Sequence, residues 1–295
     1  MVKLGFIGAG TVGTALAIRL REKGYPVVAA ASRSRSSAEK LAQRVTGCTA
    51  VGRSQDVADS AELVFITTPD NAIASVAGEV KWHPGQGVVH CCGAESTSVL
   101  EAARKSGARA GAFHPLQTFA SVEKALENIP GSTIAIEADA ELLETLKDIA
   151  GDLEGHWIEL KAEHRAVYHA SAVIACNYLV TLEKLATDIW HTFGIPRQQA
   201  VQALLPLIKG TIRNIENVGI PDCLTGPIAR GDVATVKKHL EELERSSPEL
   251  TSTYRELGLK TIPIARDKGR IDEDSAGELE AVLSGYWALR GETSK

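Results

Sequence analysis

The first thirteen residues limit the fold of this chain more than any other segment. A short apolar run, Leu4–Gly8, ends in Gly8-Ala9-Gly10-Thr11-Val12-Gly13, where a helical pattern begins. The order strand, tight turn, helix is the context in which Gly-x-Gly-x-x-Gly cradles a pyrophosphate. Gly8 permits the turn, Gly10 leaves room for phosphates, and Gly13 lets the helix pack closely on the strand. The helix start at Thr11 and Val12 offers free N–H groups to an anion. The alternative is a structural turn without a ligand.

The end of the second expected strand indicates which dinucleotide binds. Pro26–Ala31 reads as this strand, and Ser32, Arg33 and Ser34 follow it. A carboxylate at this point would hold the ribose 2′-hydroxyl of NAD, whereas an arginine suits the 2′-phosphate of NADP. No carboxylate occurs between Glu22 and Glu39. We therefore expect NADP(H) as the cofactor, with a solvated basic loop as the alternative.

Composition excludes several other classes of protein. The chain has 295 residues, a length typical of about two domains, and a net charge of −5. It has no basic cluster for nucleic acid and no apolar stretch long enough to cross a membrane. The five cysteines lack Cys-x-x-Cys spacing, which disfavours a zinc site or a disulfide scaffold. The same cysteines fit a reducing cytoplasm, and we expect no metal. Since a core strand begins at Leu4, we expect no signal peptide. The expected partner is a small-molecule substrate.

The first half alternates strand and helix patterns. Near-continuous apolar strands separated by helices predict an α/β fold with a doubly wound parallel sheet. In such a sheet, ligands bind outside the carboxyl ends of the strands. The expected strands are Leu4–Gly8, Pro26–Ala31, Leu63–Thr67, Gly87–Cys91, Ala108–Phe113 and Thr133–Glu137.

Helical patterns dominate after Trp157. The sequence therefore predicts a dinucleotide-binding domain over residues 1–156 and an all-helical substrate and dimerisation domain over residues 157–295. Gly258 reads as a helix stop. The expected helices run over about residues 162–193, then over Arg197–Asn217, Asp232–Leu243, Pro248–Leu257 and Ala276–Leu289.

Two strand ends carry small or polar residues that could contact the cofactor. Thr67, Thr68 and Pro69 follow one strand, and we expect them to line a ribose, although a plain turn is equally consistent. Cys92 and Gly93 follow the next strand, where a glycine permits close approach of the backbone.

His114 is the foremost candidate for acid–base chemistry. A strand delivers it to the same edge, Pro115 is expected to stop further pairing, and Gln117 and Thr118 follow within one turn. An imidazole, an amide and a hydroxyl would suit a polar substrate beside a nicotinamide. A structural hydrogen bond is the alternative role for this histidine.

The helical half adds three candidates. Eight residues of an α-helix advance the azimuth by about 80°, so His169 and Asn177 are expected to border one groove. Arg230 stands beside a turn at Gly226-Pro227 and could clamp a substrate carboxylate. A buried helix with satisfied polar groups and a structural salt bridge are the respective alternatives.

Taken together, these motifs resemble a bacterial family of predicted NADP oxidoreductases. Its members join a Rossmann-like domain to a helical domain of unknown function that resembles the C-terminal domain of 6-phosphogluconate dehydrogenase. The chain is more distantly similar to ketopantoate reductase, pyrroline-5-carboxylate reductase and prephenate dehydrogenase. The resemblance implies a helical domain that closes over the nicotinamide, and a homodimer formed through it. It covers nearly the whole chain and rests on the glycine turn, on His90–Ala94, Phe113–Phe119 and Leu224–Asp232, and on Tyr168-His169 with Asn177.

One departure from these relatives affects the mechanism. Several of them carry a catalytic lysine early on the first long helix, a turn before an asparagine. The corresponding stretch here, Arg165–Ala170, contains no lysine; Lys161 precedes it and Lys184 lies well beyond it.

The sequence thus predicts an NADP(H)-dependent oxidoreductase that acts on a small polar, carboxylated substrate. His114 and then His169 are the expected acid–base groups, Asn177 would orient the substrate, and Arg230 would hold its anionic group. Gln117 and Thr118 would add substrate contacts. The alternatives are an NADP-binding sensor without turnover and a ketopantoate-type reductase that uses histidine in place of lysine.

Overall fold

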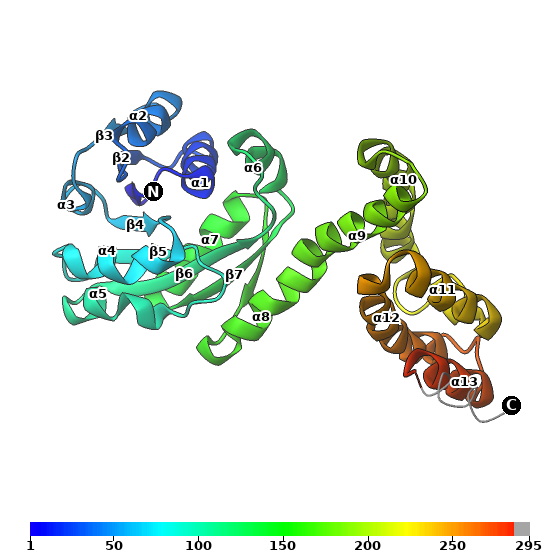
Figure 1. The fold of residues 1–295 in the computed structure, drawn as a ribbon. Helices are drawn as coiled ribbons and strands as arrows, with labels where there is room; N and C mark the ends of the chain where they lie inside the picture. The colour runs from blue at the N-terminus through cyan, green and yellow to red at the C-terminus, as the bar shows by residue number, and fades with distance from the viewer. Residues whose placement is uncertain (286–295) are drawn as a thin grey trace, which may run out of the picture. The chain divides into compact units, whose positions relative to one another are not determined.

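The structure is a computed structural model and describes residues 1–285 (Figure 1). The chain forms two compact units, Met1–Asn177 and a second unit that begins at Tyr178. The first unit contains every strand of the described chain and the helix that follows the last strand, and the second is helical. The last strand ends at Glu159, close to the predicted change from strands to helices at residue 157.

The first unit is built on one eight-stranded sheet. The strand order is β3-β2-β1-β4-β5-β6-β7-β8, and all neighbouring strands are parallel except β6 and β7. This mostly parallel sheet confirms the predicted fold class, although β7 and β8 run opposite to the other six strands. The strands are β1 (Leu4–Ile7), β2 (Val27–Ala31), β3 (Thr49–Ala50), β4 (Leu63–Ile66), β5 (Gly87–His90), β6 (Arg109–Leu116), β7 (Thr133–Ala138) and β8 (His156–Glu159).

The sequence pattern missed β3 and β8. Strand β3 has two residues and β8 is exposed along its length, so neither forms an apolar run. The expectation that Pro115 ends pairing is also wrong, because Pro115 pairs with Ile134 of β7. Strand β5 ends opposite Ala112, so Pro115 has a partner strand on one side only, where a proline is tolerated.

Each face of the sheet is covered by helices. Alternate strand residues such as Phe6, Phe65 and Phe113 pack on one face, and Ile7, Val64 and Ile66 pack on the other. The first face is covered by α1 (Thr11–Glu22), α2 (Arg35–Arg44), α6 (Val122–Asn128) and α7 (Ala140–Asp152). The second is covered by α3 (Ser54–Ala58), α4 (Ile73–Glu79) and α5 (Glu101–Lys105).

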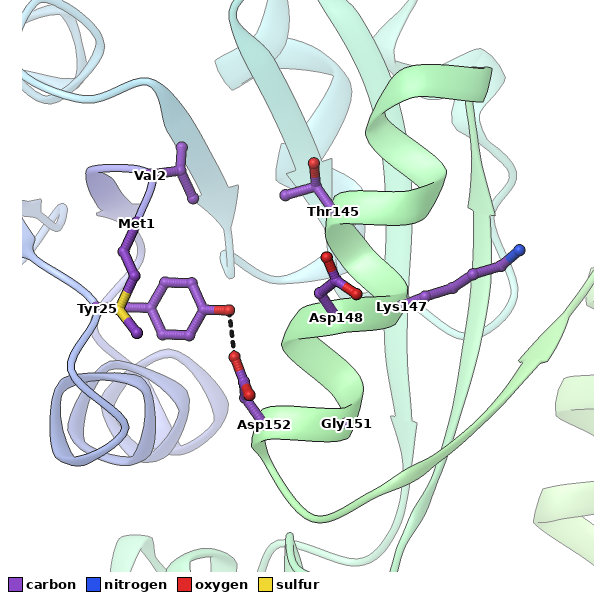
Figure 2. A pocket seen from close by; sticks show the side chains of 8 residues that line it. All are labelled: Met1, Val2, Tyr25, Thr145, Lys147, Asp148, Gly151 and Asp152. Atoms are coloured by element: carbon purple, nitrogen blue, oxygen red, sulfur yellow. Dashed lines mark hydrogen bonds between the residues drawn. The ribbon is translucent and has the colours of Figure 1, made fainter.

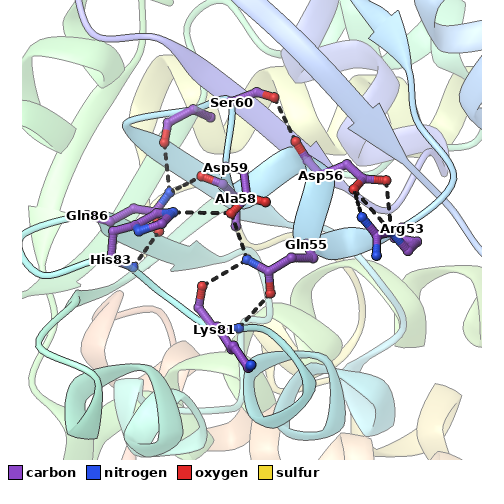
Figure 3. Close-up of polar contacts among 10 residues, drawn as sticks. Arg53, Gln55, Asp56, Ala58, Asp59, Ser60, Lys81, His83 and Gln86 are labelled. Carbon is purple, nitrogen blue, oxygen red and sulfur yellow. Dashed lines mark hydrogen bonds and ion pairs between the residues drawn. The ribbon is translucent and has the colours of Figure 1, made fainter.

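Polar side chains tie the loops together at the amino ends of β4 and β5 (Figure 3). The buried Gln86 amide donates to the carbonyl oxygens of Ala58 and Ala61, each at 2.7 Å. Gln55 exchanges two hydrogen bonds with the backbone of Lys81, at 2.8 and 3.0 Å. These groups satisfy one another and belong to the framework of the sheet.

The helical part begins at the end of the first unit. There, α8 (Arg165–Ala172) is followed by a π-helical turn, Val173–Asn177. The second unit contains α9 (Tyr178–Thr192), α10 (Arg197–Val218), α11 (Val233–Ser246), α12 (Pro248–Asp267) and α13 (Glu273–Leu283). Its core includes Val236, Leu240, Ile262 and Leu279. Within residues 1–285, no helix is both long and apolar enough to span a membrane.

The prediction that Gly258 ends a helix is wrong, since α12 continues through it to Asp267. A Cβ at Gly258 would lie 2.7 Å from Leu283 Cδ2, so the glycine allows α13 to pack closely against α12. Part of the predicted helix Ala276–Leu289 lies beyond the described residues.

Candidate cofactor and substrate site

The glycine turn joins β1 to α1 and has the geometry expected of a phosphate cradle. Gly8 adopts φ +113°, and its carbonyl accepts a hydrogen bond from Thr67 Oγ1 at 2.7 Å. A Cβ on Gly13 would lie 2.6 Å from the Gly8 carbonyl oxygen, so the close approach of helix and strand requires a glycine. A Cβ on Gly10 would meet nothing within 4 Å. The space beside Gly10 is therefore open.

A cavity of about 540 Å³ lies against this turn at the carboxyl edge of the sheet. Arg33 lines it, whereas Arg35 pairs outside with Glu39 at 3.0 Å. Five residues that were predicted to bind the cofactor do not line this cavity. Thr11 borders an adjacent hollow, and the others are Val12 and Gly13 in α1 and Cys92 and Gly93 after β5. Of the predicted cofactor residues, it gathers Gly8, Gly10, Ser32, Arg33, Ser34, Thr67, Thr68 and Pro69.

The residues around this cavity fit an NADP molecule. Helix α1 follows Gly10 without a side-chain cap or an acidic residue in its first turn, so its first N–H groups remain available to phosphates. The Thr68 hydroxyl is buried and has no hydrogen-bond partner among residues 1–285. Arg33 makes no ion pair within the same range and could reach a 2′-phosphate.

A second group of predicted residues meets at the same edge of the sheet. Strand β6 extends past the end of β5 and carries His114 beyond that edge. Gly93 follows β5, and a Cβ there would lie 2.8 Å from His114 Nε2 and 2.6 Å from His169 Nδ1. The two imidazole rings stand 5.9 Å apart, nearly perpendicular. Both rings pack over Gly93, where a larger residue would not fit.

Tyr168 lies on the other side of the His114 ring, although the sequence indicated it only as part of the Tyr168-His169 motif, without a role at the site. Its hydroxyl lies 2.9 Å from His114 Nδ1. Burial, together with the charges of His169 and Arg165, lowers the pKa of His114 to about 4. Burial also raises the pKa of Tyr168 to about 12. At neutral pH the imidazole is uncharged and the phenol is protonated.

Arg165 organises the site, although the sequence indicates only that it belongs to a stretch without lysine. It is 1% exposed, and its Nε donates to Glu137 Oε2 at 2.6 Å. Its Nη1 donates to the Cys92 carbonyl at 3.2 Å, while Nη2 is buried without a partner among the described residues. Thr97 completes the carboxylate's hydrogen bonds, at 2.6 and 3.0 Å. No sequence pattern marks this role, because the partner of Arg165, Glu137, is 28 residues away in the chain and is brought close only by the fold.

Neighbouring buried groups are structural. His90 donates from Nε2 to the Ser96 carbonyl and accepts from the Cys92 backbone N–H, both at 3.2 Å. Burial lowers the pKa of His90 to about 4 and raises that of the Cys91 thiol to about 12. Both residues are therefore uncharged at neutral pH.

The remaining candidates lie on other segments of the chain. Gln117 and Thr118 are exposed, and the Gln117 side chain accepts from the Thr118 backbone N–H at 2.8 Å. Asn177 ends the π-helical turn, so the azimuth predicted for an uninterrupted α-helix does not apply to it. Arg230 lies in the second unit and is exposed.

A hollow of about 630 Å³ also occurs at the opposite end of the sheet (Figure 2). Tyr25 and Asp152 line it and share a hydrogen bond of 2.6 Å. It lies near the amino ends of β1 and β2, whereas ligands of such sheets bind at the carboxyl ends. In residues 1–285, no cluster of three or more His, Cys, Asp or Glu side chains could hold a metal ion.

The sheet and its glycine turn define a Rossmann-like protein, and residues 1–115 match the Rossmann-like domain family. Residues 132–261 match the family described as a domain of unknown function, DUF2520. The chain thus combines an N-terminal Rossmann-like domain with a DUF2520 domain, which confirms the resemblance stated from the sequence. No curated protein matches the chain.

Solved structures support this assignment. A Thermotoga maritima protein is 29% identical, with a TM-score of 0.74 over 90% of this chain and 100% of that one. A Bacteroides fragilis protein, provisionally named an NADP oxidoreductase, is 27% identical, with a TM-score of 0.72 over 89% and 98%. Pyrroline carboxylate reductase from Plasmodium falciparum, solved with NADP bound, is 15% identical, with a TM-score of 0.56 over 96% and 100%. The last likeness shows a shared fold.

Proposed function

We propose that the protein is an NADP(H)-dependent oxidoreductase acting on a small polar substrate that carries a carboxylate. One observation carries the proposal: a cavity formed by the glycine turn and Arg33 shares a sheet edge with the partly buried His114. Asp70, directly after the cavity residue Pro69, interacts with Cys92 and with His114. The NADP oxidoreductase name of the Bacteroides fragilis relative supports the same class.

The residues of the cavity have distinct roles in this proposal. The N–H groups at Gly10, Thr11 and Val12 would bind the pyrophosphate, and the Arg33 loop would bind the 2′-phosphate. Bound NADPH supplies a hydride to a carbonyl or imine carbon. His114 would contact the substrate heteroatom, and His169 would pack beside it. Asn177 and Arg230 would orient the substrate and hold its carboxylate.

The proposal is tested by binding and turnover on the full chain. NADPH fluorescence should report saturable binding that is tighter than NADH binding. Small keto acids (including ketopantoate) and cyclic imines should then be screened for NADPH consumption, and hydroxy acids for NADP⁺ reduction. Failure to bind NADPH would overturn the proposal. Replacing His114 with alanine should depress turnover and leave NADPH affinity intact.

A second candidate function is an NADP-binding sensor. The absence of lysine over Arg165–Ala170, where several relatives hold a catalytic lysine, favours it. Tight NADPH binding without consumption across the whole panel would support the sensor. Turnover of ketopantoate alone would instead identify a ketopantoate-type reductase in which histidine replaces lysine.

A further inference from the structure

The contact between Tyr168 and His114 determines which nitrogen of His114 can face a substrate. The phenolic oxygen lies 2.9 Å from Nδ1, and the two rings meet edge to face at 5.7 Å. With Nδ1 occupied by this partner, Nε2 is the nitrogen left for another group. Gly93 gives Nε2 its space, since a Cβ there would lie 2.8 Å away.

The acid–base properties of the pair favour one arrangement of the shared proton. Near neutral pH the imidazole carries one proton and the phenol keeps its own, because the pKa values are about 4 and about 12. A phenolic O–H is a stronger donor than an imidazole N–H, and an imidazole nitrogen is a better acceptor than a phenolic oxygen. Tyr168 therefore donates to Nδ1, and the ring proton resides on Nε2.

We propose that Tyr168 holds His114 as the Nε2–H tautomer and that the pair delivers the proton that completes the reduction. This inference rests on the proposed oxidoreductase function. His114 is then the catalytic residue that touches the substrate. Tyr168 acts through it as a positioning residue and as the source of the proton.

The proton step balances without another reagent. The substrate heteroatom gains an electron pair as the adjacent carbon receives the nicotinamide hydride. The heteroatom then takes the proton from His114 Nε2, while Nδ1 takes the proton from Tyr168. The products are a neutral alcohol or amine, the opposite neutral tautomer of His114, and a phenolate that water reprotonates. His114 thus transfers a proton without becoming charged.

The surroundings of the pair suit this route. The charges of three neighbours, His169, Arg165 and His90, disfavour a cationic His114, whereas the negative charge of Asp70 favours it. The charge of Arg165 offsets part of the rise that burial causes in the pKa of Tyr168, and it would stabilise the phenolate. Arg165 starts the helix that carries Tyr168 three residues later, so one buried cation both places the phenol and supports its ionised form.

Nitrogen NMR of the full chain, labelled with 15N-histidine and free of cofactor, tests the tautomer directly. The His114 signals are assigned by their loss in the His114→Gln variant. Between pH 5.5 and 8 they should show an unprotonated Nδ1 and a protonated Nε2. In Tyr168→Phe, which keeps the ring and removes the hydroxyl, this preference should be lost. A proton on Nδ1 in the wild type, or signals unchanged in Tyr168→Phe, would overturn the inference.

The chain provides a matched control for this experiment. His239 and Tyr254 form a second pair of the same kind, with Nδ1 2.8 Å from the hydroxyl and rings 5.9 Å apart. Tyr254→Phe should change the His239 signals and leave those of His114 unchanged. A change at His114 in this variant would show that loss of any such hydroxyl disturbs the fold.

Kinetics provide the second arm once a substrate is turned over. Tyr168→Phe should lower kcat about 10²-fold and reduce the solvent isotope effect, with unchanged NADPH affinity. Equal kcat would overturn the proton route and leave the oxidoreductase assignment intact. Conversely, absence of NADPH binding would refute the proposed function, while the NMR result would still decide the tautomer.

Discussion

Gly93 shows how one residue can set the geometry of a site without contributing a functional group. It lies directly beneath two imidazole rings, and the missing side chain lets both approach the same backbone atom. The neighbouring Cys92 carbonyl accepts a hydrogen bond from Arg165, which fixes the same loop to α8. Small and buried groups therefore position the candidate catalytic histidines.

At the residue scale, Arg33 should decide the choice between the two nicotinamide cofactors. Arg33→Asp should weaken NADPH binding about 10- to 100-fold and improve NADH binding, because a charge-assisted contact is replaced by repulsion. Fluorescence titration measures both affinities. Arg35→Asp is the matched control, since Arg35 is engaged by Glu39 and should alter the preference little. Equal NADPH affinity in wild type and Arg33→Asp would contradict the 2′-phosphate assignment.

His114 should also make the stability of the protein depend on pH. Its pKa is about 4 in the fold, below the ordinary value of 6.5, so the unfolded chain binds a proton first as the pH falls. Its contribution is fully present above pH 6.5 and is lost as the pH falls toward 4. Between pH 8 and 5 this amounts to roughly 2 kcal/mol.

Urea unfolding of wild type and His114→Gln at pH 8 and pH 5 measures this contribution. The variant should lose less free energy of unfolding than the wild type over that range, by roughly 2 kcal/mol. An equal loss in both proteins would show that His114 titrates normally in the fold.

At the element scale, α8 is anchored to the sheet by a buried ion pair. Arg165 is 1% exposed and reaches Glu137 of β7 and the loop after β5. Because Tyr168 and His169 lie three and four residues further along the helix, they share its face. The anchor therefore sets where both side chains stand relative to His114.

Removing one partner of this pair should be costly. Glu137→Leu leaves a buried guanidinium without its carboxylate and should lower the free energy of unfolding by about 3–5 kcal/mol. The double variant with Arg165→Leu should recover part of that loss, which urea unfolding can measure. The exposed pair Lys124–Glu127 is the control, and its removal should cost less than about 1 kcal/mol. Additive losses at residues 137 and 165 would contradict a coupled anchor.

At the scale of the whole molecule, α10 points to association between copies of the chain. Of its 22 residues only Ala200 is buried, and one stripe exposes Val201, Leu205, Ile212 and Ile215. An uncovered apolar stripe of this kind typically marks an interface. We propose that it covers the same helix of a second copy, in agreement with the homodimer implied by the family resemblance.

Light scattering tests this proposal in solution. The wild type should have about twice the chain mass of 31.4 kDa, and the double variant Leu205→Glu/Ile212→Glu should be monomeric. The control is Leu257→Glu, a change at an exposed leucine of α12 that should leave the dimer intact. A monomeric wild type would refute the proposed interface.

The sequence by itself determined the features that depend on chain order. A strand, a glycine turn and a helix adjoin in sequence, so the tight turn after β1 and the basic loop after β2 were predictable from Gly8, Gly10, Gly13 and Arg33. Apolar runs likewise located six strands of the sheet. The two short or exposed strands gave no such signal, because a strand with no buried face needs no apolar pattern.

Only the tertiary structure decided how the candidate site is assembled. Tyr168 meets His114 across 54 residues and Arg165 meets Glu137 across 28. The first contact depends on the length of β6, the second on the position of β7, and both on the start of α8. The π-helical turn likewise changed the expected relation between His169 and Asn177. Local periodicity encodes which face of an element is buried. The partners of buried polar groups are set by register and packing between distant elements, which local patterns do not encode.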